Sequence, residues 1–481
     1  MELKAFGIGR LLQRHGQKHK HEHKQKQKQS QVTAVAQSER KRVFAHFIVG
    51  NANSMTAEQW QSDIQLAKDA HIDGFALNIA AQDINNETSL QKAYAAAEAV
   101  GDFTLFLSFD YESQGPWPVD KVISTINTYK DSTAQFRYQG KPLVSTFEGT
   151  GNVHDWPTVI SATGIYFMPC WTSLGHSGLA SVLDIVDGFF SWDAWPVGAS
   201  DMSTSSDQAW IAALGGKPYM MPVSPWFYTN LPEWSKNWLW RGDDLWHDRW
   251  QQVIELQPEM VEIITWNDYG ESHYIGPVYQ EGIPQGALRY AANNPHDAWR
   301  ALLPHYIDAY KSGNSSMATK TTASTASSSQ DIITYWYRTN PSSAGSTGGT
   351  TGNNPAMGQP VMEPSQLSQD KVFVTVLVQA PSQVTVKIGG GNTATLDANH
   401  AGINHFSVPF NGQTGPVTIA IVRNGKQVAT ATGPAITEEC TDGLVNWNAY
   451  VGSSSLDNTG NTPASNITAS NATASNTTSS A

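Results

Sequence analysis

The chain has 481 residues, of which 40% are hydrophobic and 15% charged, and its formal net charge is −12. Residues 1–42 hold 11 Lys and Arg against 3 Asp and Glu, so this end is net +8 and the rest of the chain is net −20. Such an acidic body argues against nucleic acid or an anionic membrane surface as the main partner.

Both ends of the chain have compositions that do not suit a folded core. Residues 1–42 form a basic leader rich in His and Gln, and residues 453–481 form a tail rich in Ser, Thr and Asn, so we predict both to be disordered. The chain has no run of eighteen apolar residues, which argues against a membrane span. The two cysteines, Cys170 and Cys440, predict free thiols, because two cysteines make no disulfide framework.

From residue 43 onwards, short apolar segments alternate with amphipathic ones. The apolar segments predict eight strands, at 43–50, 74–80, 103–109, 142–147, 165–171, 185–192, 219–223 and 261–265. The amphipathic segments predict helices, of which the clearest lie at 90–100, 119–129, 206–214, 245–256 and 298–310. Thr56, with Gln59 three residues on, marks the start of the first helix.

Eight strands alternating with helices predict a (β/α)8 barrel over residues 43–311, since this order demands parallel strands joined by helical crossovers. A doubly wound open sheet is the alternative. That fold usually carries a glycine-rich phosphate loop after an early strand, and this sequence has none there.

After residue 311 the composition changes. Residues 312–330 are rich in Ser and Thr and predict a linker. Short strands are predicted at 332–338, 372–379, 384–388, 406–409, 417–423 and 427–432. We therefore predict a small β-sandwich over residues 331–452, with a disordered insert rich in Gly, Pro, Ser and Thr at 341–369.

Fifteen of the 17 tryptophans lie between residues 43 and 311, which is more aromatic surface than a core requires. Clefts that bind sugars have this composition, because the apolar face of a pyranose packs on an aromatic ring. Together with the acidic body, the tryptophans predict a neutral polysaccharide as the partner.

The segment 266–277, WNDYGESHYIGP, resembles a signature of glycoside hydrolase family 71, the fungal α-1,3-glucanases or mutanases. Segments 44–50, 73–78, 189–196 and 221–228 resemble further motifs of that family in the same order, and the resemblance covers residues 43–452. It implies a barrel fold and hydrolysis of α-1,3-glucan with inversion at the anomeric carbon.

Polar residues at the carboxyl ends of barrel strands are expected to face a substrate. Asp268 and Glu271 follow the strand predicted at 261–265, and we predict that they carry catalysis. The side chains predicted to bind sugar are Asn78, Asp110, Glu148, Trp192, Asp193, Trp195, Trp226, Tyr228, Trp266, His273 and Tyr274. His46, at the end of the first strand, is predicted to be a core or hydrogen-bonding residue.

Glycoside hydrolysis uses one carboxyl group to protonate the leaving oxygen and a second to activate water or attack the anomeric carbon. We assign Glu271 as the general acid and Asp268 as the general base, and the reverse assignment stays open. Inversion requires about 6.5–9.5 Å between the two carboxyl groups, which an acid and its third neighbour across Gly270 can reach. This chemistry needs no cofactor and no metal.

Two other functions stay open: a glucan-binding wall protein without catalysis, and a barrel hydrolase that acts on a different glucan linkage. We expect a monomer. We also expect that it works outside the cell or in the cell wall, because the tail carries the glycosylation sequons Asn466, Asn471 and Asn476. Residues 1–12 lack the apolar stretch of a secretory signal, which leaves an intracellular form as the alternative. Lys41-Arg42 is a candidate processing site.

Overall fold

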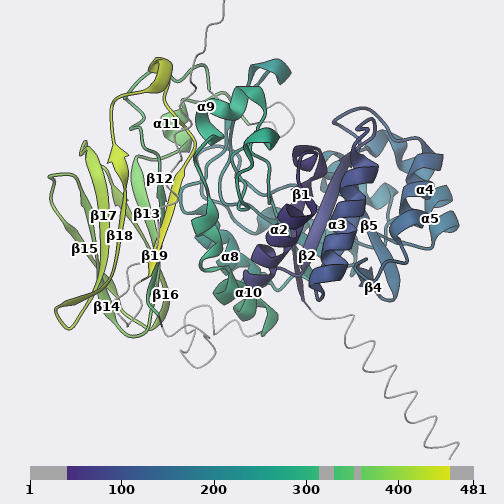
Figure 1. Ribbon diagram of the computed structural model, residues 1–481, viewed down its shortest axis with the longest axis horizontal. Coiled ribbons are helices and arrows are strands. Elements are labelled where there is room, and N and C mark those ends of the chain that lie inside the picture. The colour runs from purple at the N-terminus through teal and green to yellow at the C-terminus, as the bar shows by residue number, and fades with distance from the viewer. Residues whose placement is uncertain (1–40, 314–329, 351–358, 456–481) are drawn as a thin grey trace, which may run out of the picture.

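The structure is a computed structural model that describes residues 41–313, 330–350 and 359–455. The predictions of a disordered leader and tail, and of a linker at 312–330, fall almost wholly outside these residues. Figure 1 shows an α/β part and, beside it, a part made of antiparallel sheets.

A curled parallel sheet forms the centre of the α/β part. Its strands are β1 (Arg42–Ile48), β2 (Gly74–Ala80), β3 (Thr104–Asp110), β5 (Lys141–Phe147), β6 (Tyr166–Phe167), β7 (Phe189–Phe190), β8 (Tyr219–Val223) and β11 (Met260–Ile263). β1 pairs with β2 on one side and β11 on the other, so the first and last strands of the series are neighbours. Each of the eight strands lies within or next to a strand predicted from the sequence. A short strand, β4 (Arg137–Tyr138), joins β5 antiparallel.

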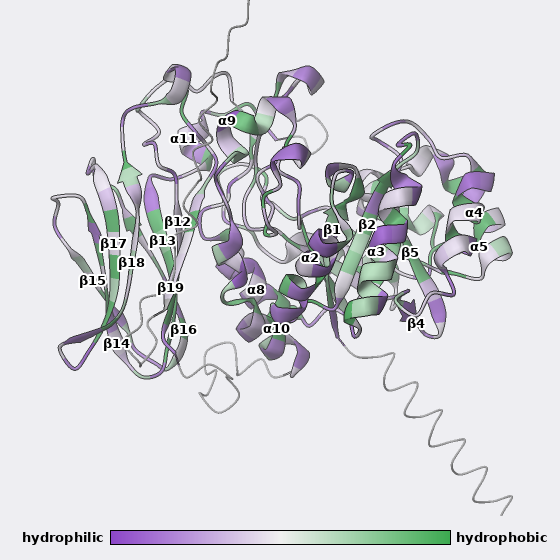
Figure 2. Ribbon diagram, viewed as in Figure 1, coloured by the Kyte–Doolittle hydropathy of each residue, from purple (hydrophilic) through white to green (hydrophobic). Residues whose placement is uncertain are grey.

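Both faces of this sheet are buried, which is why its strands read as near-continuous hydrophobic runs. Successive side chains point to opposite faces. One face contributes Phe44, Phe106, Met220 and Met260 to an inner cluster. The neighbouring residues Val43, Leu105, Met221 and Val261 belong to the cluster that also contains the helix residues Trp60 and Ile64. In Figure 2 the labelled strands β1 and β2 carry hydrophobic colour, whereas the helices around them are mixed.

The main helices of the α/β part are α2 (Ala57–Asp69), α3 (Asn86–Val100), α4 (Val119–Tyr129), α5 (Trp156–Thr163), α7 (Ser205–Leu214), α8 (Leu245–Leu256) and α10 (Leu303–Lys311). The capping box predicted at Thr56 and Gln59 is present. The helix predicted at 298–310 is divided, because a 3-10 turn at Asp297–Arg300 precedes α10, whose first turn contains a proline. Within the described residues, no helix is both long and apolar enough to cross a bilayer.

A hairpin of β9 (Tyr228–Leu231) and β10 (Lys236–Leu239) follows β8 and was not predicted from the sequence. Its strands have four residues each, and a 3-10 turn at Pro232–Trp234 separates them. Strands this short give too few alternations for a period of two to be recognised.

Residues 332–455 supply two four-stranded antiparallel sheets. One contains β12 (Ile332–Tyr337), β13 (Lys371–Val378), β16 (Gly402–Pro409) and β19 (Tyr450–Ser455), and the other contains β14 (Ser382–Ile388), β15 (Ala394–Ala398), β17 (Gly415–Arg423) and β18 (Lys426–Ile436). Residues of both sheets share one apolar core. β15 and β19 were not among the predicted strands; β15 has only five residues, of which one is buried.

The first of these sheets packs its other face against the α/β part. Trp336 of β12 donates its Nε1–H to the carbonyl of Asp243 (2.7 Å), and Trp226 donates to the carbonyl of Trp447 (3.0 Å). Trp336, Phe373 and Trp447 accordingly belong to the same apolar cluster as the helices of the α/β part.

An insert at 341–369 was predicted to be disordered. Where the structure describes this insert, it shows contacts and a short helix instead. The Asn237 side chain on β10 donates to the carbonyl of Gly348 (2.8 Å) and accepts from Thr350 Oγ1 (2.5 Å). A short helix, α11 (Pro364–Leu367), follows at the other end of the insert. A composition rich in Gly and Ser does not reveal contacts with a distant hairpin, which is why the sequence indicated disorder.

Candidate active site

The loop after β11 is fixed at the carboxyl ends of β11 and β1. Trp266 donates its backbone N–H to the carbonyl of His46 (2.7 Å), and the Asn267 side chain exchanges two hydrogen bonds with the backbone of Ile48 (2.8 and 3.0 Å). Thr265 donates its N–H to the carbonyl of His273 (3.0 Å), so the chain folds back on itself. Asp268 and Glu271 therefore lie on a rigid loop at the predicted edge of the sheet.

Four side chains converge on this loop: Asp268, Glu271, His273 and Lys236. Glu271 Oε1 lies 2.9 Å from Lys236 Nζ, and Glu271 Oε2 lies 3.0 Å from His273 Nε2. Asp268 Oδ1 accepts the backbone N–H of Glu271 (3.1 Å). His273 is held from behind by the hydroxyl of Thr265, which lies 3.1 Å from its Nδ1.

The two carboxyl groups have opposite electrostatics. Burial, followed by the charge of Glu271, raises the pKa of Asp268. Burial alone would raise the pKa of Glu271 too, but the ammonium of Lys236 and the contact with His273 outweigh it and lower that pKa to about 2. At neutral pH the site thus combines a firmly ionised Glu271 with an Asp268 that holds its proton more strongly than usual.

A metal ion could in principle use this cluster, since one oxygen of Asp268, one of Glu271 and a ring nitrogen of His273 all lie within 4.8 Å of one another. However, Lys236 already neutralises Glu271. The donor set therefore fits a proton-transfer site better than a cation site, because an ammonium beside the ligand oxygens repels a divalent ion.

Three more of the predicted acids lie at the ends of neighbouring strands. Asp110, at the end of β3, accepts the backbone N–H groups of Glu112 and Ser113 (2.8 and 2.9 Å), and its charge helps to raise the pKa of Lys236. Glu148, after β5, accepts the N–H of Ser173 (3.1 Å). Burial raises the pKa of Glu148, and the charges of Glu112 and Asp193 add to the effect.

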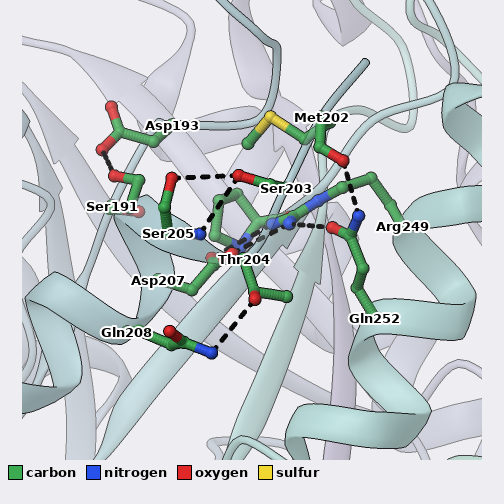
Figure 3. Close-up of polar contacts among 12 residues, drawn as sticks. Ser191, Asp193, Met202, Ser203, Thr204, Ser205, Asp207, Gln208, Arg249 and Gln252 are labelled. Atoms are coloured by element: carbon green, nitrogen blue, oxygen red, sulfur yellow. Dashed lines mark hydrogen bonds and ion pairs between the residues drawn. The ribbon is translucent and has the colours of Figure 1, made fainter.

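Asp193 follows β7 and is held by α7. It accepts hydrogen bonds from Ser206 Oγ (2.6 Å) and from Trp210 Nε1 (2.7 Å). Figure 3 shows the polar network beneath it, in which Arg249 of α8 is paired with Asp207 of α7 at 2.8 Å, both side chains being fully buried. This buried pair fixes α7 against α8 and so keeps the carboxylate of Asp193 in place.

The model of glycosyl hydrolase family 71 matches residues 39–463. The chain belongs to glycosyl hydrolase family 71. It is 37% identical over 428 residues to the glucan endo-1,3-alpha-glucosidase agn1 of Schizosaccharomyces pombe, covering 86% of this chain and 94% of that protein. It is 36% identical to a mutanase of Penicillium rubens, covering 89% and 92% of the two chains, and 28% identical to an ascus wall endo-1,3-alpha-glucanase of Schizosaccharomyces pombe, covering 77% and 86%.

Trp192 and Trp195, two of the aromatic residues predicted to bind sugar in this family 71 chain, follow β7 on the same segment as Asp193. Trp195 lies against the ring of His273, with 5.4 Å between ring centroids, and is 7% exposed. Trp192 is half-buried, and its ring packs edge-on against His46 and Phe147. Asn78 lies between Ile48 and Ser108 in the sheet register and is 4% exposed.

Four other predicted sugar-binding residues lie in the core of this family 71 chain. Trp226 and Tyr228 are each 1% exposed, and Trp266 and Tyr274 are fully buried. Their polar atoms are bound within the protein, since Trp266 Nε1 donates to Asp63 (2.7 Å) and the Tyr274 hydroxyl donates to the carbonyl of Asn294 (2.6 Å). Proximity to a strand end in sequence does not determine whether a ring points into the cleft or into the protein.

Lys236 is the residue of the site that sequence reasoning missed. It lies on the unpredicted strand β10, 35 residues before Glu271, so no motif joins the two. His46, by contrast, is a hydrogen-bonding core histidine as predicted: its Nδ1 lies 2.7 Å from Glu262 Oε1, and both side chains are buried.

Proposed function

We propose that this protein hydrolyses α-1,3-glucosidic bonds in α-1,3-glucan. The observation that supports this most directly is the pair of Asp268 and Glu271 on one loop, in which the pKa of Asp268 is raised and the pKa of Glu271 is lowered. A glycosidase needs two such groups at once. The linkage is inferred from the relatives, whose names state α-1,3-glucan bonds.

The electrostatics favour the reverse of the assignment made from the sequence. We propose Asp268 as the general acid, because its raised pKa keeps a proton available for the leaving oxygen. Glu271 is proposed as the carboxylate that activates water, because Lys236 and His273 keep it ionised. In this proposal His273 also orients the carboxylate of Glu271, because its Nε2 lies 3.0 Å from Glu271 Oε2.

Inversion, which the family resemblance implies, places a condition on this pair. A carboxylate oxygen of Asp268 lies within 4.8 Å of one of Glu271, closer than the roughly 6.5–9.5 Å between carboxyl groups of inverting enzymes. We therefore propose that the bound glucan separates the two groups to admit water. NMR of the first product decides: the β-anomer supports inversion, and the α-anomer would show that Glu271 attacks the sugar directly.

We propose further that the curled sheet closes into a (β/α)8 barrel. β6 pairs with β5, and Cys170, three residues after β6, bridges both Phe147 at the end of β5 and Phe190 of β7. These bridges connect the two edges of the sheet. In a closed barrel, the strand ends bearing Asp110, Glu148, Asp193 and Asp268 form one ring around the substrate.

The catalytic proposal is tested by replacing each carboxyl group with its amide. We expect Asp268→Asn and Glu271→Gln each to lower turnover of α-1,3-glucan by about 10²- to 10⁴-fold, because the amide keeps the volume and loses the proton transfer. Asp193→Asn and Glu148→Gln are the matched controls at neighbouring strand ends. If a control is the more severe, the chemistry belongs to β5 and β7 instead.

The same assay separates the alternative functions. Wild-type protein that binds insoluble α-1,3-glucan and releases no sugar would be a binding protein. Wild-type protein that releases sugar from β-1,3-glucan and not from α-1,3-glucan would be a hydrolase of another linkage.

We also propose that the protein works outside the cell or in the cell wall, as the name of the ascus wall relative states for that protein. Sequencing the N-terminus of the native protein and measuring its glycan mass tests this. A chain that begins at Val43 and carries N-glycans supports export, and an unglycosylated chain that retains Glu2 contradicts it. The sequon at Asn86 is a poor acceptor, because its side-chain amide donates to the carbonyl of Ala80 (2.7 Å).

A further inference from the structure

Trp234 lies at the tip of the hairpin β9–β10 with 58% of its surface exposed. The other exposed large hydrophobic residues among those described are aliphatic: Ile84, Val197, Ile211, Leu288 and Val361. An indole ring in water is unusual in a chain whose other described tryptophans are buried or half-buried. Neither the sequence predictions nor the comparisons assign this residue a role.

The tip that carries Trp234 is rigid. Pro232 begins the 3-10 turn, and Ser235 ends it in the left-handed conformation (φ 53°), with its N–H donated to the carbonyl of Pro232 (3.1 Å). Glu233 fastens the tip to a second segment by accepting the backbone N–H of Gly286 (3.0 Å). The ring is thus presented on a fixed support, which reduces the entropy that a ligand must overcome.

The hairpin connects this ring to the proposed catalytic pair. Lys236, two residues after Trp234, contacts Glu271 at 2.9 Å. Tyr228, at the other end of the hairpin, donates its N–H to the carbonyl of Glu271 (3.1 Å) and accepts from Ser272 Oγ (2.7 Å). Only Ser235 separates Trp234 from Lys236, so the tip that carries the exposed ring also carries the lysine that contacts the proposed catalytic pair.

We propose that Trp234 is a stacking platform for a neutral glucan chain, at an outer subsite beyond the bond that is cleaved. The proposal rests on the proposed function. A pyranose presents an apolar face to an aromatic ring, and the acidic body of the chain disfavours an anionic ligand. A single ring between Glu233 and Ser235 is too small an apolar patch for a stable protein interface, which buries roughly 800 Å² on each partner.

The test compares Trp234→Ala with Trp234→Phe, which keeps a ring. Ile84→Ser is the control, because Ile84 is 92% exposed and lies before α3, outside the hairpin. Binding to insoluble α-1,3-glucan is measured in a Glu271→Gln background, and kcat/KM is measured on long and on short α-1,3-glucan chains in the otherwise wild-type protein.

We expect Trp234→Ala to weaken binding about two- to tenfold and to lower the long-to-short ratio of kcat/KM by a similar factor. Trp234→Phe should retain most of both, and Ile84→Ser should match the parent protein. An unchanged ratio in Trp234→Ala overturns the inference, and so does a change of oligomeric state in size-exclusion chromatography, which would assign the ring to self-association. If the wild-type protein does not cleave α-1,3-glucan, the proposed function fails instead.

Discussion

Of the two carboxyl groups, Lys236 contacts Glu271, and its charge favours the ionised form of that group. The pKa of Lys236 is raised, chiefly by the charge of Glu271 and against the effect of burial, so each partner keeps the other ionised. Among the described residues, no lysine or arginine contacts Asp268 directly, and the neighbouring charge of Glu271 makes its ionisation harder. One side chain from a hairpin thus separates the pKa values of two acids that lie three residues apart.

Replacing Lys236 with Met tests this directly. Without the ammonium, burial dominates and the pKa of Glu271 rises from about 2, so the acidic limb of the kcat/KM profile should move to higher pH and activity at pH 4 should fall more than activity at pH 6. Lys141→Met is the control, because Lys141 is exposed at the opposite, amino end of β5. An unmoved acidic limb would mean that Lys236 does not set the charge of Glu271.

At the scale of elements, the tryptophan-rich segment after β8 serves packing more than binding. Trp226 lies two residues before β9 and is 1% exposed, and its hydrogen bond to the carbonyl of Trp447 joins the α/β part to the C-terminal part. The ring also fills the space over Gly242, where a Cβ would approach it to 2.3 Å. Trp226 is therefore a structural residue of the interface.

We expect Trp226→Ala to lower the free energy of unfolding by about 3–5 kcal/mol, because it leaves a large cavity in a packed core. Trp234→Ala, on the exposed tip of the hairpin β9–β10, should change it by less than about 0.5 kcal/mol. Urea denaturation of the two variants measures both. If the Trp226→Ala protein is stable and binds glucan more weakly, then Trp226 binds the sugar as predicted from the sequence.

At the scale of the whole molecule, the α/β part and the C-terminal sheets share a histidine stack. His247 of α8 and His405 of β16 have parallel rings with centroids 4.4 Å apart. His405 lies 2.8 Å from a carboxylate oxygen of Asp244, whereas His247 Nδ1 lies 2.8 Å from the hydroxyl of Tyr306. Burial, followed by the presence of His405, holds the pKa of His247 well below its usual range.

This stack predicts a loss of stability in mild acid. Because the folded pKa of His247 is depressed, the unfolded chain binds the extra proton below about pH 6.5, so the free energy of unfolding falls as the pH falls, by up to about 1.4 kcal/mol per unit for this group. His247→Phe keeps the stacked ring and removes the titration, and should flatten the slope between pH 7.5 and 5.5. Urea denaturation at both pH values measures it, and an equally steep slope in the variant contradicts the assignment.

The sequence by itself determined the order of the main strands and helices of the α/β part, and it singled out the two acids on one loop. Strands β1, β2, β3, β5 and β8 are largely apolar segments between amphipathic helices, and these signals are local. The motif containing Asp268 and Glu271 is also local, and the family resemblance that it carries is confirmed by the match over residues 39–463.

Only the tertiary structure decided which side chains share the site and which are buried. Lys236 meets Glu271 because a hairpin folds across the loop, and Trp226 is buried because a sheet more than a hundred residues away covers it. The pKa order of the two acids follows from those contacts, and it is the ground on which we propose the reverse of the assignment made from the sequence. Contacts between distant segments leave no periodicity and no spacing in the chain, so they cannot be derived until the fold brings the segments together.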